Sequence, residues 1–307
     1  MDDDYNSGMG CPSESSLAGR AKVCDGCPGK ALCQKQGGVD PDQEMINLRM
    51  NAIKYKILIL SGKGGVGKSS IAVGLSISLA QHSNKVGLVD VDICGPSISK
   101  LMAVEGAKVV NTQYGWTPLK SPHEDVKVMS VGNILEHSDN AIIWRGPRKT
   151  QLIKRFIKDT FWGRLDYILF DTPPGTSDEH LTVVSALKNV KPEGAIIVTT
   201  PQQVALTTIR KEINFCRKMG IRIIGIVENM SGYVCPCCQE VSYLFQSGGA
   251  EKLADEYGLK LLGKIPVDSN LTACAEEGSN LFTKHPDSPA SIAFRKIATE
   301  LETTLPR

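Results

Sequence analysis

The fold is decided at Ser61-Gly62-Lys63-Gly64-Gly65-Val66-Gly67-Lys68-Ser69, which follows an apolar run at 56–60 and opens a helical pattern. The stretch matches the phosphate-binding pattern G-x-x-x-x-G-K-[ST] in the strand–loop–helix context that the pattern requires. Glycines let backbone N–H groups curve around phosphate oxygens, and the helix N-terminus adds a positive dipole. The alternative is a chance match in a glycine-rich turn. The predicted nucleotide-binding residues of the loop are Gly62, Lys63, Gly64, Gly65, Val66, Gly67, Lys68, Ser69 and Ser70.

Two side chains of this loop have predicted chemical roles. We expect Lys68 to contact the β- and γ-phosphates of ATP and to act in catalysis, and the Ser69 hydroxyl to ligate Mg²⁺. Lys63 makes the loop resemble the deviant Walker A motif K-G-G-x-G-K-[ST] of the MinD, partition-ATPase and nitrogenase iron-protein group. That resemblance implies a catalytic Lys63 that reaches the partner's nucleotide when two subunits meet. The alternative is that Lys63 is a solvated loop residue.

Outward from the loop, short apolar runs alternate with helical patterns. Strands are predicted at 56–60, 85–89, 126–131, 167–170, 195–199, 221–227 and 261–265. Helices are predicted at 69–81, 147–158, 179–188, 204–218, 250–257 and 289–305. Near-continuous Ile/Val/Leu strands suit a parallel sheet that is covered on both faces. The prediction is a doubly wound, mostly parallel α/β P-loop NTPase domain over residues 51–307, resembling MinD and the nitrogenase iron protein.

Acidic residues follow two of the predicted strands. Ligands of parallel sheets bind outside the carboxyl ends of the strands, so these carboxylates are expected beside the loop. Asp171 matches the Walker B position of P-loop ATPases, where a carboxylate holds Mg²⁺ through water. Asp92 matches the first switch segment of the MinD and nitrogenase iron-protein group, where a carboxylate orients the attacking water. Asp90 either bridges to the metal site or fixes its loop. Helix capping is the alternative for such acids. Asn229 matches the residue that contacts the adenine edge in the same group of ATPases. The alternative is that Asn229 only stabilises a turn.

Composition and charge narrow the class of protein. The chain has 307 residues, 41% hydrophobic and 22% charged, with a formal net charge of +2, which gives no indication of a nucleic-acid partner. No stretch approaches the roughly 20 apolar residues that span a membrane. The start Met1-Asp2-Asp3-Asp4 is unlike a secretory signal, so a cytoplasmic location is expected. In a reducing compartment, clustered cysteines suggest metal rather than disulfides.

One cysteine cluster is Cys235-Pro236-Cys237-Cys238. Cys235 and Cys238 form a C-x-x-C pair, and Cys237 is an additional thiol inside it. A closed metal or cluster site needs four ligands, so one chain brings half a site and a two-fold dimer would complete it. Half of a zinc ribbon and a redox-active dithiol are the alternatives.

The other cluster is Cys11, Cys24, Cys27 and Cys33, inside a predicted cysteine-rich extension at residues 1–50. Four thiolates suffice for one [4Fe–4S] site, and metal binding would supply the folding energy of a segment too poor in apolar residues for a core. Zinc fits the same count.

Taken together, the motifs closely resemble the Mrp/NUBP family of cytosolic iron–sulfur cluster assembly ATPases, in particular members with an N-terminal cysteine extension. The further stretches that carry this resemblance are Asp92-Ile93-Cys94-Gly95-Pro96-Ser97, Trp144-Arg145-Gly146-Pro147, Asp171-Thr172-Pro173-Pro174-Gly175-Thr176-Ser177-Asp178-Glu179-His180 and Val227-Glu228-Asn229-Met230-Ser231-Gly232. Two departures are the first N-terminal cysteine spacing, one residue shorter than expected, and the extra Cys237.

The resemblance implies ATP and Mg²⁺ as ligands, a labile [4Fe–4S] cluster that bridges two subunits, and a tighter N-terminal cluster. It also implies a homodimer, or a heterotetramer with a paralogue lacking the N-terminal cysteines, and delivery of clusters through targeting factors to cytosolic and nuclear apo-proteins. Two other functions remain open. One is a nucleotide-gated electron donor. The other is a partition or MinD-type organiser, against which the mixed charge of residues 294–307 argues.

Overall fold

The computed structural model describes residues 22–25, 30, 42–134, 146–245 and 247–306. The chain divides into two compact units, Met1–Ile46 and Asn47–Arg307. In the first unit the short 3-10 helix η1 (Lys22–Cys24) contains a buried Cys24, and Lys30 forms an ion pair with Asp25. Helix α2 (Gln43–Asn51) continues across the boundary between the units, and the division into 1–50 and 51–307 stays a prediction.

The second unit is built on one large sheet. Its strands are β1 (Ile53–Leu60), β2 (Val86–Asp90), β5 (Leu119–Lys120), β6 (Val126–Ser130), β7 (Leu165–Asp171), β8 (Gly194–Thr199), β9 (Ile223–Val234), β10 (Val241–Ser242) and β11 (Leu261–Val267). Within the described residues they follow the order β10-β9-β8-β1-β7-β2-β6-β5, and β11 also pairs with β9. All pairs are parallel except those of β5 with β6 and of β10 with β9. A separate hairpin joins β3 (Val110–Thr112) to β4 (Gly115–Thr117).

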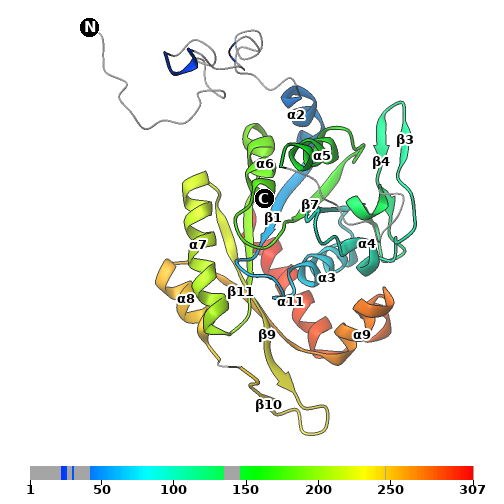
Figure 1. Cartoon of the computed structure of the whole chain (residues 1–307). Helices are drawn as coiled ribbons and strands as arrows, with labels where there is room; N and C mark the ends of the chain where they lie inside the picture. Colours follow the sequence, from blue (N-terminus) through cyan, green and yellow to red (C-terminus); the bar gives the residue numbers. More distant parts are fainter. Residues whose placement is uncertain (1–21, 26–29, 31–41, 135–145, 246, 307) are drawn as a thin grey trace. The chain divides into compact units, whose positions relative to one another are not determined.

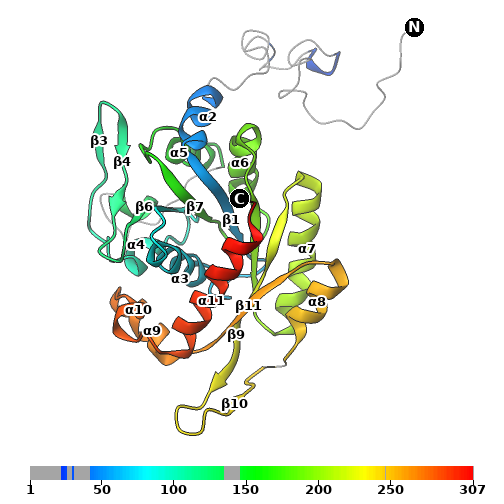
Figure 2. The ribbon, with the colours of Figure 1, turned by 180° about the vertical axis from the view of Figure 1, so that it is seen from behind.

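Helices cover both faces of the sheet, as Figures 1 and 2 show from opposite sides. The helices of this unit are α3 (Lys68–Gln81), α4 (Ile98–Leu101), α5 (Gly146–Lys158), α6 (Asp178–Leu187), α7 (Gln203–Met219), α8 (Gly249–Tyr257), α9 (Ser269–Glu277), α10 (Leu281–Lys284) and α11 (Pro289–Thr304). Alternate residues of β8 face opposite layers: Ile196 packs in the cluster with α3 and α11, and Ile197 packs with α7 and α8. The parallel sheet is therefore buried on both sides.

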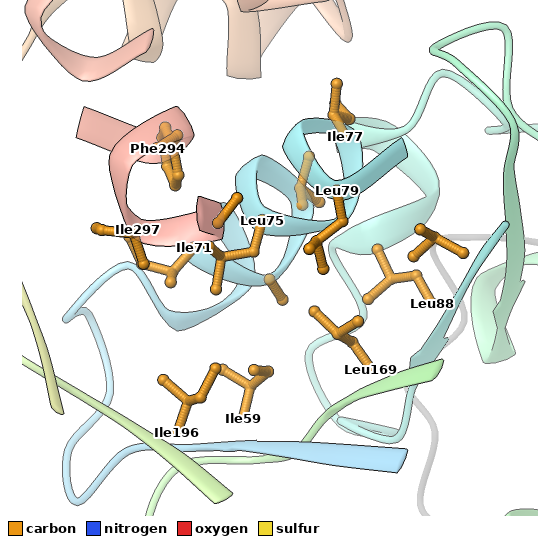
Figure 3. Packing of buried hydrophobic residues seen from close by; sticks show 14 of the residues in the cluster. Ile59, Ile71, Leu75, Ile77, Leu79, Leu88, Leu169, Ile196, Phe294 and Ile297 are labelled. Carbon is orange, nitrogen blue, oxygen red and sulfur yellow. The ribbon is translucent and has the colours of Figure 1, made fainter. Parts of the chain in front are cut away.

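The main core lies directly behind the glycine-rich loop. Ile71 and Leu75 of α3 pack with Ile59 of β1 and with α11, as Figure 3 shows. Gly74 of α3 allows this close packing, because an added Cβ would lie 2.3 Å from the ring of Phe294. The core thus fixes the first turn of α3, and with it the loop that precedes this helix.

The predicted doubly wound α/β fold is confirmed, and each predicted strand and helix overlaps an observed element, with ends that differ by one or two residues in several of them. The sequence did not predict helix α2, the short elements β3, β4, β5, β10, α4, α9 and α10, or the extension of β9 to Val234. Several of these elements are only two to four residues long, too short to show a clear hydrophobic period. No helix among the described residues is long and apolar enough to cross a membrane.

Candidate nucleotide site and cysteine hairpin

The glycine-rich loop runs from the end of β1 at Leu60 to the start of α3 at Lys68. Two of its glycines are required by close approach. A Cβ on Gly62 would lie 2.7 Å from the backbone carbon of Thr208, and a Cβ on Gly67 would lie 2.3 Å from Nδ2 of Asn229. Gly67 also has φ +81°, a left-handed conformation that disfavours other residues. Gly65 has φ +78°, but an added Cβ there would meet no atom within 4 Å.

Lys68 and Ser69 both contact the carboxylate at the end of β7. Lys68 Nζ forms an ion pair with Asp171 Oδ1, and Ser69 Oγ donates a hydrogen bond of 2.6 Å to Asp171 Oδ2. Asp171 is fully buried, and Lys68 is 6% exposed. Burial raises the pKa of Asp171, while the charge of Lys68 and the hydrogen bonds from Lys68 and Ser69 oppose that shift. The pair of oxygens offered by Ser69 and Asp171 suits Mg²⁺, which prefers oxygen ligands.

Asp90 lies opposite Asp171 on the neighbouring strand β2. It is fully buried, and its carboxylate accepts hydrogen bonds from the backbone N–H groups of Asp92 and Ile98, each at 3.2 Å, and from Ser130 Oγ at 3.1 Å. Burial, and then the charge of Asp171, raise the pKa of Asp90 to about 8. These hydrogen bonds fix the loop after β2.

A cavity of about 840 Å³ opens beside the glycine-rich loop. Its lining includes the predicted site residues Lys63, Gly64, Gly65, Val66, Gly67, Lys68, Ser69, Ser70, Asp92 and Asn229. Gly62 packs beneath the loop against Thr208, and Asp171 lies buried below Lys68 and Ser69. Asp92 is partly exposed, and its Oδ1 accepts a 3.2 Å hydrogen bond from the Gly95 N–H. Asn229 Nδ2 donates to the Val66 carbonyl at 2.9 Å.

The cavity wall includes parts that were not predicted, and two of them lie far from the loop in sequence. One follows β11 and includes Pro266, Val267, Asp268 and, on α9, Leu271. The strand-end rule that identified Asp171 applies equally to the end of β11 and could have found this wall. The other part is Leu244 and Phe245, which follow β10 and belong to no motif that would have identified them.

The predicted C-x-x-C pair lies at the tip of the β9–β10 hairpin. Cys235 N–H donates to the Glu240 carbonyl at 3.0 Å, and Gln239 N–H donates to the Cys235 carbonyl at 2.9 Å, which closes the turn. Cys237 and Cys238 are exposed. Backbone N–H groups of Cys238 and then Cys237 lower the pKa of the Cys235 thiol, which favours the thiolate form that binds metals.

This hairpin alone does not make a closed metal site. Among the described residues, no group of three or more His, Cys, Asp or Glu side chains is arranged to hold a metal ion. Cys216 and Cys274 are buried in helices α7 and α9, and burial raises the pKa of Cys216 to about 12. Both behave as core residues. Of the N-terminal set, Cys11, Cys27 and Cys33 lie outside the described residues, so ligation by these three and Cys24 stays a prediction.

The loop, its buried Lys68, its Ser69 and the buried Asp171 on the neighbouring strand end define a P-loop nucleotide-binding protein. The family model described as ParA, NUBPL iron-transfer P-loop NTPase, matches residues 52–302, and the chain belongs to this family of iron-transfer NTPases.

Solved structures of similar proteins agree with this assignment. A nucleotide-binding protein of Archaeoglobus fulgidus, determined in complex with ADP and with cobalt found in it, is 37% identical. The match covers 77% of this chain and 91% of that chain, with a TM-score of 0.68. The cell-division ATPase MinD of Pyrococcus furiosus is 27% identical, with coverages of 81% and 98% and a TM-score of 0.62. MinD of Pyrococcus horikoshii, complexed with Mg-ADP, is 25% identical, with coverages of 81% and 96% and a TM-score of 0.60.

Proposed function

We propose that this chain is a cytoplasmic scaffold ATPase that assembles [4Fe–4S] clusters and transfers them to apo-proteins. The observation that carries the proposal is the course of strand β9. This one strand brings Asn229 to the nucleotide cavity and ends at Val234, directly before Cys235. The returning chain places Leu244 and Phe245 in the wall of the same cavity. A change in the bound nucleotide would therefore act on both ends of the cysteine hairpin.

In this proposal the nucleotide site works as follows. The glycine-rich loop and Lys68 bind the phosphates of ATP, Ser69 and Asp171 hold Mg²⁺, and Asn229 contacts the adenine edge. Phosphate binding would draw the ammonium of Lys68 away from Asp171 and free that carboxylate for the metal. Asp92 orients the attacking water from the cavity wall.

Lys63 is suited to act in the partner's site. It is exposed at the cavity, and within the described residues it makes no hydrogen bond or ion pair. An exposed cation of this kind can stabilise charge that develops in the transition state when a second subunit approaches. Hydrolysis would then be fast only in the dimer.

The cysteine hairpin supplies half of the site for the cluster that is transferred. Cys235 and Cys238 of two chains would give the four thiolates of a bridging [4Fe–4S] cluster. Exposed apolar side chains flank these cysteines: Tyr233 (37% exposed), Val241 (44%), Tyr243 (60%) and Leu244 (62%). A second subunit, identical or a paralogue without the N-terminal cysteines, would cover this surface. The N-terminal cysteines would hold a second cluster.

Anaerobic reconstitution with iron and sulfide tests the proposal. We expect Cys235→Ala and Cys238→Ala each to abolish the bridging cluster and its transfer to an apo-acceptor, while the N-terminal cluster stays. Cys216→Ala is the matched control, because that thiol is buried in α7, and it should keep the wild-type iron content. Equal iron in all three variants would refute the bridging site. Reduction of a partner without transfer of the cluster would instead indicate an electron donor.

A further inference from the structure

A cation outside the nucleotide cavity connects the loop after β2, which carries Asp92, to the start of α6, the helix that follows Asp171. Lys149, in the first turn of α5, donates through Nζ to Cys94 Sγ at 2.9 Å and to Glu179 Oε1 at 3.0 Å. Cys94 follows β2 by four residues, and Glu179 lies in the first turn of α6, eight residues after Asp171. Helices α5 and α6 lie side by side in both views of the fold (Figures 1 and 2).

The ammonium group has only partial access to water. The Lys149 side chain is 20% exposed, and that of Glu179 is 7% exposed. Hydrogen bonds to Cys94 and then to Glu179 raise the pKa of Lys149, so it stays charged throughout the physiological range. Burial acts to raise the pKa of Glu179, but hydrogen bonds from Ser177 and Lys149 outweigh this and lower it. A charged hydrogen bond at such a site is stronger than one on an open surface.

The residue after Cys94 connects this contact to the Asp92 carboxylate. Cys94 is followed by Gly95, whose N–H donates to Asp92 Oδ1 at 3.2 Å. A displacement of Cys94 therefore moves the N–H group that holds the Asp92 carboxylate. On the other side, Glu179 is held by α6, whose first turn is fixed by the capping box of Ser177 and His180. Lys149 thus connects a firm helix end to an exposed loop.

We propose that Lys149 is a positioning residue for nucleotide hydrolysis: through Cys94 it holds the loop 91–97 so that Asp92 faces the cavity. Lys149 lies outside the cavity lining, so we expect it to act without contacting the nucleotide. The proposal rests on the proposed role of Asp92 in hydrolysis. In this proposal ATP binding and ATP hydrolysis depend on different residues. The glycine-rich loop binds ATP without Lys149, whereas hydrolysis requires Lys149.

The test compares four variants of the full-length chain. Lys149→Met keeps the aliphatic stem but removes the cation, Lys149→Arg keeps the charge, and Cys94→Ala removes the sulfur acceptor. Arg148→Met is the matched control, because it removes one exposed charge from the adjacent position of α5. A misplaced reacting group costs up to about a hundredfold in rate. We expect Lys149→Met and Cys94→Ala to lower kcat for ATP by about tenfold or more, with KM changed less than about twofold.

The two other variants should behave differently. Arg148→Met should match wild type in both constants, and Lys149→Arg should restore most of kcat. Wild-type kcat in Lys149→Met, an equal loss in Arg148→Met, or a change in KM alone would overturn the proposal.

Hydrogen–deuterium exchange provides a readout that does not depend on hydrolysis. Lys149→Met should speed exchange in the peptide covering 91–97 and leave the glycine-rich loop peptide unchanged, and Arg148→Met should do neither. If wild type fails to hydrolyse ATP, the proposed function fails, and the exchange result still decides whether Lys149 holds this loop. Unchanged exchange at 91–97 in Lys149→Met would refute the positioning role.

Discussion

The ion pair between Lys68 and Asp171 makes a sharp prediction about the nucleotide-free protein. Both side chains are almost completely buried, at 6% and 0% exposure. Lys68→Met removes the ammonium and keeps the stem, which leaves the Asp171 carboxylate with the Ser69 hydroxyl at 2.6 Å. Breaking a buried pair by removing one partner costs about 3–5 kcal/mol. We expect Lys68→Met to lower the free energy of unfolding by that amount at pH 7.5, and Asp171→Asn to lower it similarly.

The double variant separates pairing from simple loss of contacts. Lys68→Met with Asp171→Asn removes both charges, and replacing a buried pair by neutral residues of similar volume is often neutral for stability. The double variant should therefore lie within about 1 kcal/mol of wild type. Urea unfolding followed by tryptophan fluorescence measures this, since Trp162 is fully buried in the same unit. The double variant should remain without ATPase activity, because both groups are required for hydrolysis.

A double variant as unstable as the sum of the two single variants would refute the reasoning. Additive losses would mean that the two charges do not compensate each other in the nucleotide-free protein. In that case Lys68 could not pass from Asp171 to an incoming phosphate, and the proposed release of the Asp171 carboxylate would be wrong.

Three further predictions follow from particular contacts. Gly67→Ala should lower the free energy of unfolding, measured in urea, by at least about 1 kcal/mol more than Gly65→Ala does. Both substitutions place a side chain in a left-handed conformation, but only the alanine at 67 would displace Asn229. Equal losses of stability in the two variants would contradict this. Burial raises the pKa of Glu212 to about 7 from 4.5, so its contribution to stability is greatest below pH 4.5 and is lost as pH rises through 7. Glu212→Gln should therefore raise the free energy of unfolding by about 3 kcal/mol at pH 8 and little at pH 4, and a constant difference would be contrary to expectation. Tyr243→Ser should weaken dimer formation in sedimentation without lowering the melting temperature of the monomer, and unchanged dimerisation would show that Tyr243 does not contribute to the interface.

The sequence predicted the parts of the site whose chemistry is local. The glycine-rich loop needs specific residues at fixed spacing, so the sequence alone predicts that Gly62 and Lys68 belong to the nucleotide site. Asp171 was predicted because a parallel sheet brings the carboxyl ends of its strands to one edge, and the structure brings it within hydrogen-bonding distance of Ser69. The half-site of Cys235 and Cys238 rests on counting thiols in the sequence, and it stays a prediction.

Contacts set by tertiary packing were not predictable. The bond between Lys149 and Cys94 joins residues 55 positions apart through the approach of α5 to the loop after β2. No sequence pattern links a lysine at 149 with a cysteine at 94, so their contact could not be predicted. Likewise, Leu244 reaches the nucleotide cavity only because β10 folds back on β9. The role of Asp90 was left open for the same reason, since hydrogen-bond donors to its carboxylate come from the start of α4 and from strand β6.

Native mass spectrometry of a full-length variant tests the central claim most directly. Replacing Cys11, Cys24, Cys27 and Cys33 by alanine leaves Cys235 and Cys238 as the sulfur pair at issue. After anaerobic reconstitution with iron and sulfide, we predict one [4Fe–4S] cluster on each dimer and none on the monomer. A cluster on the monomer, or dimers without iron, would contradict the account.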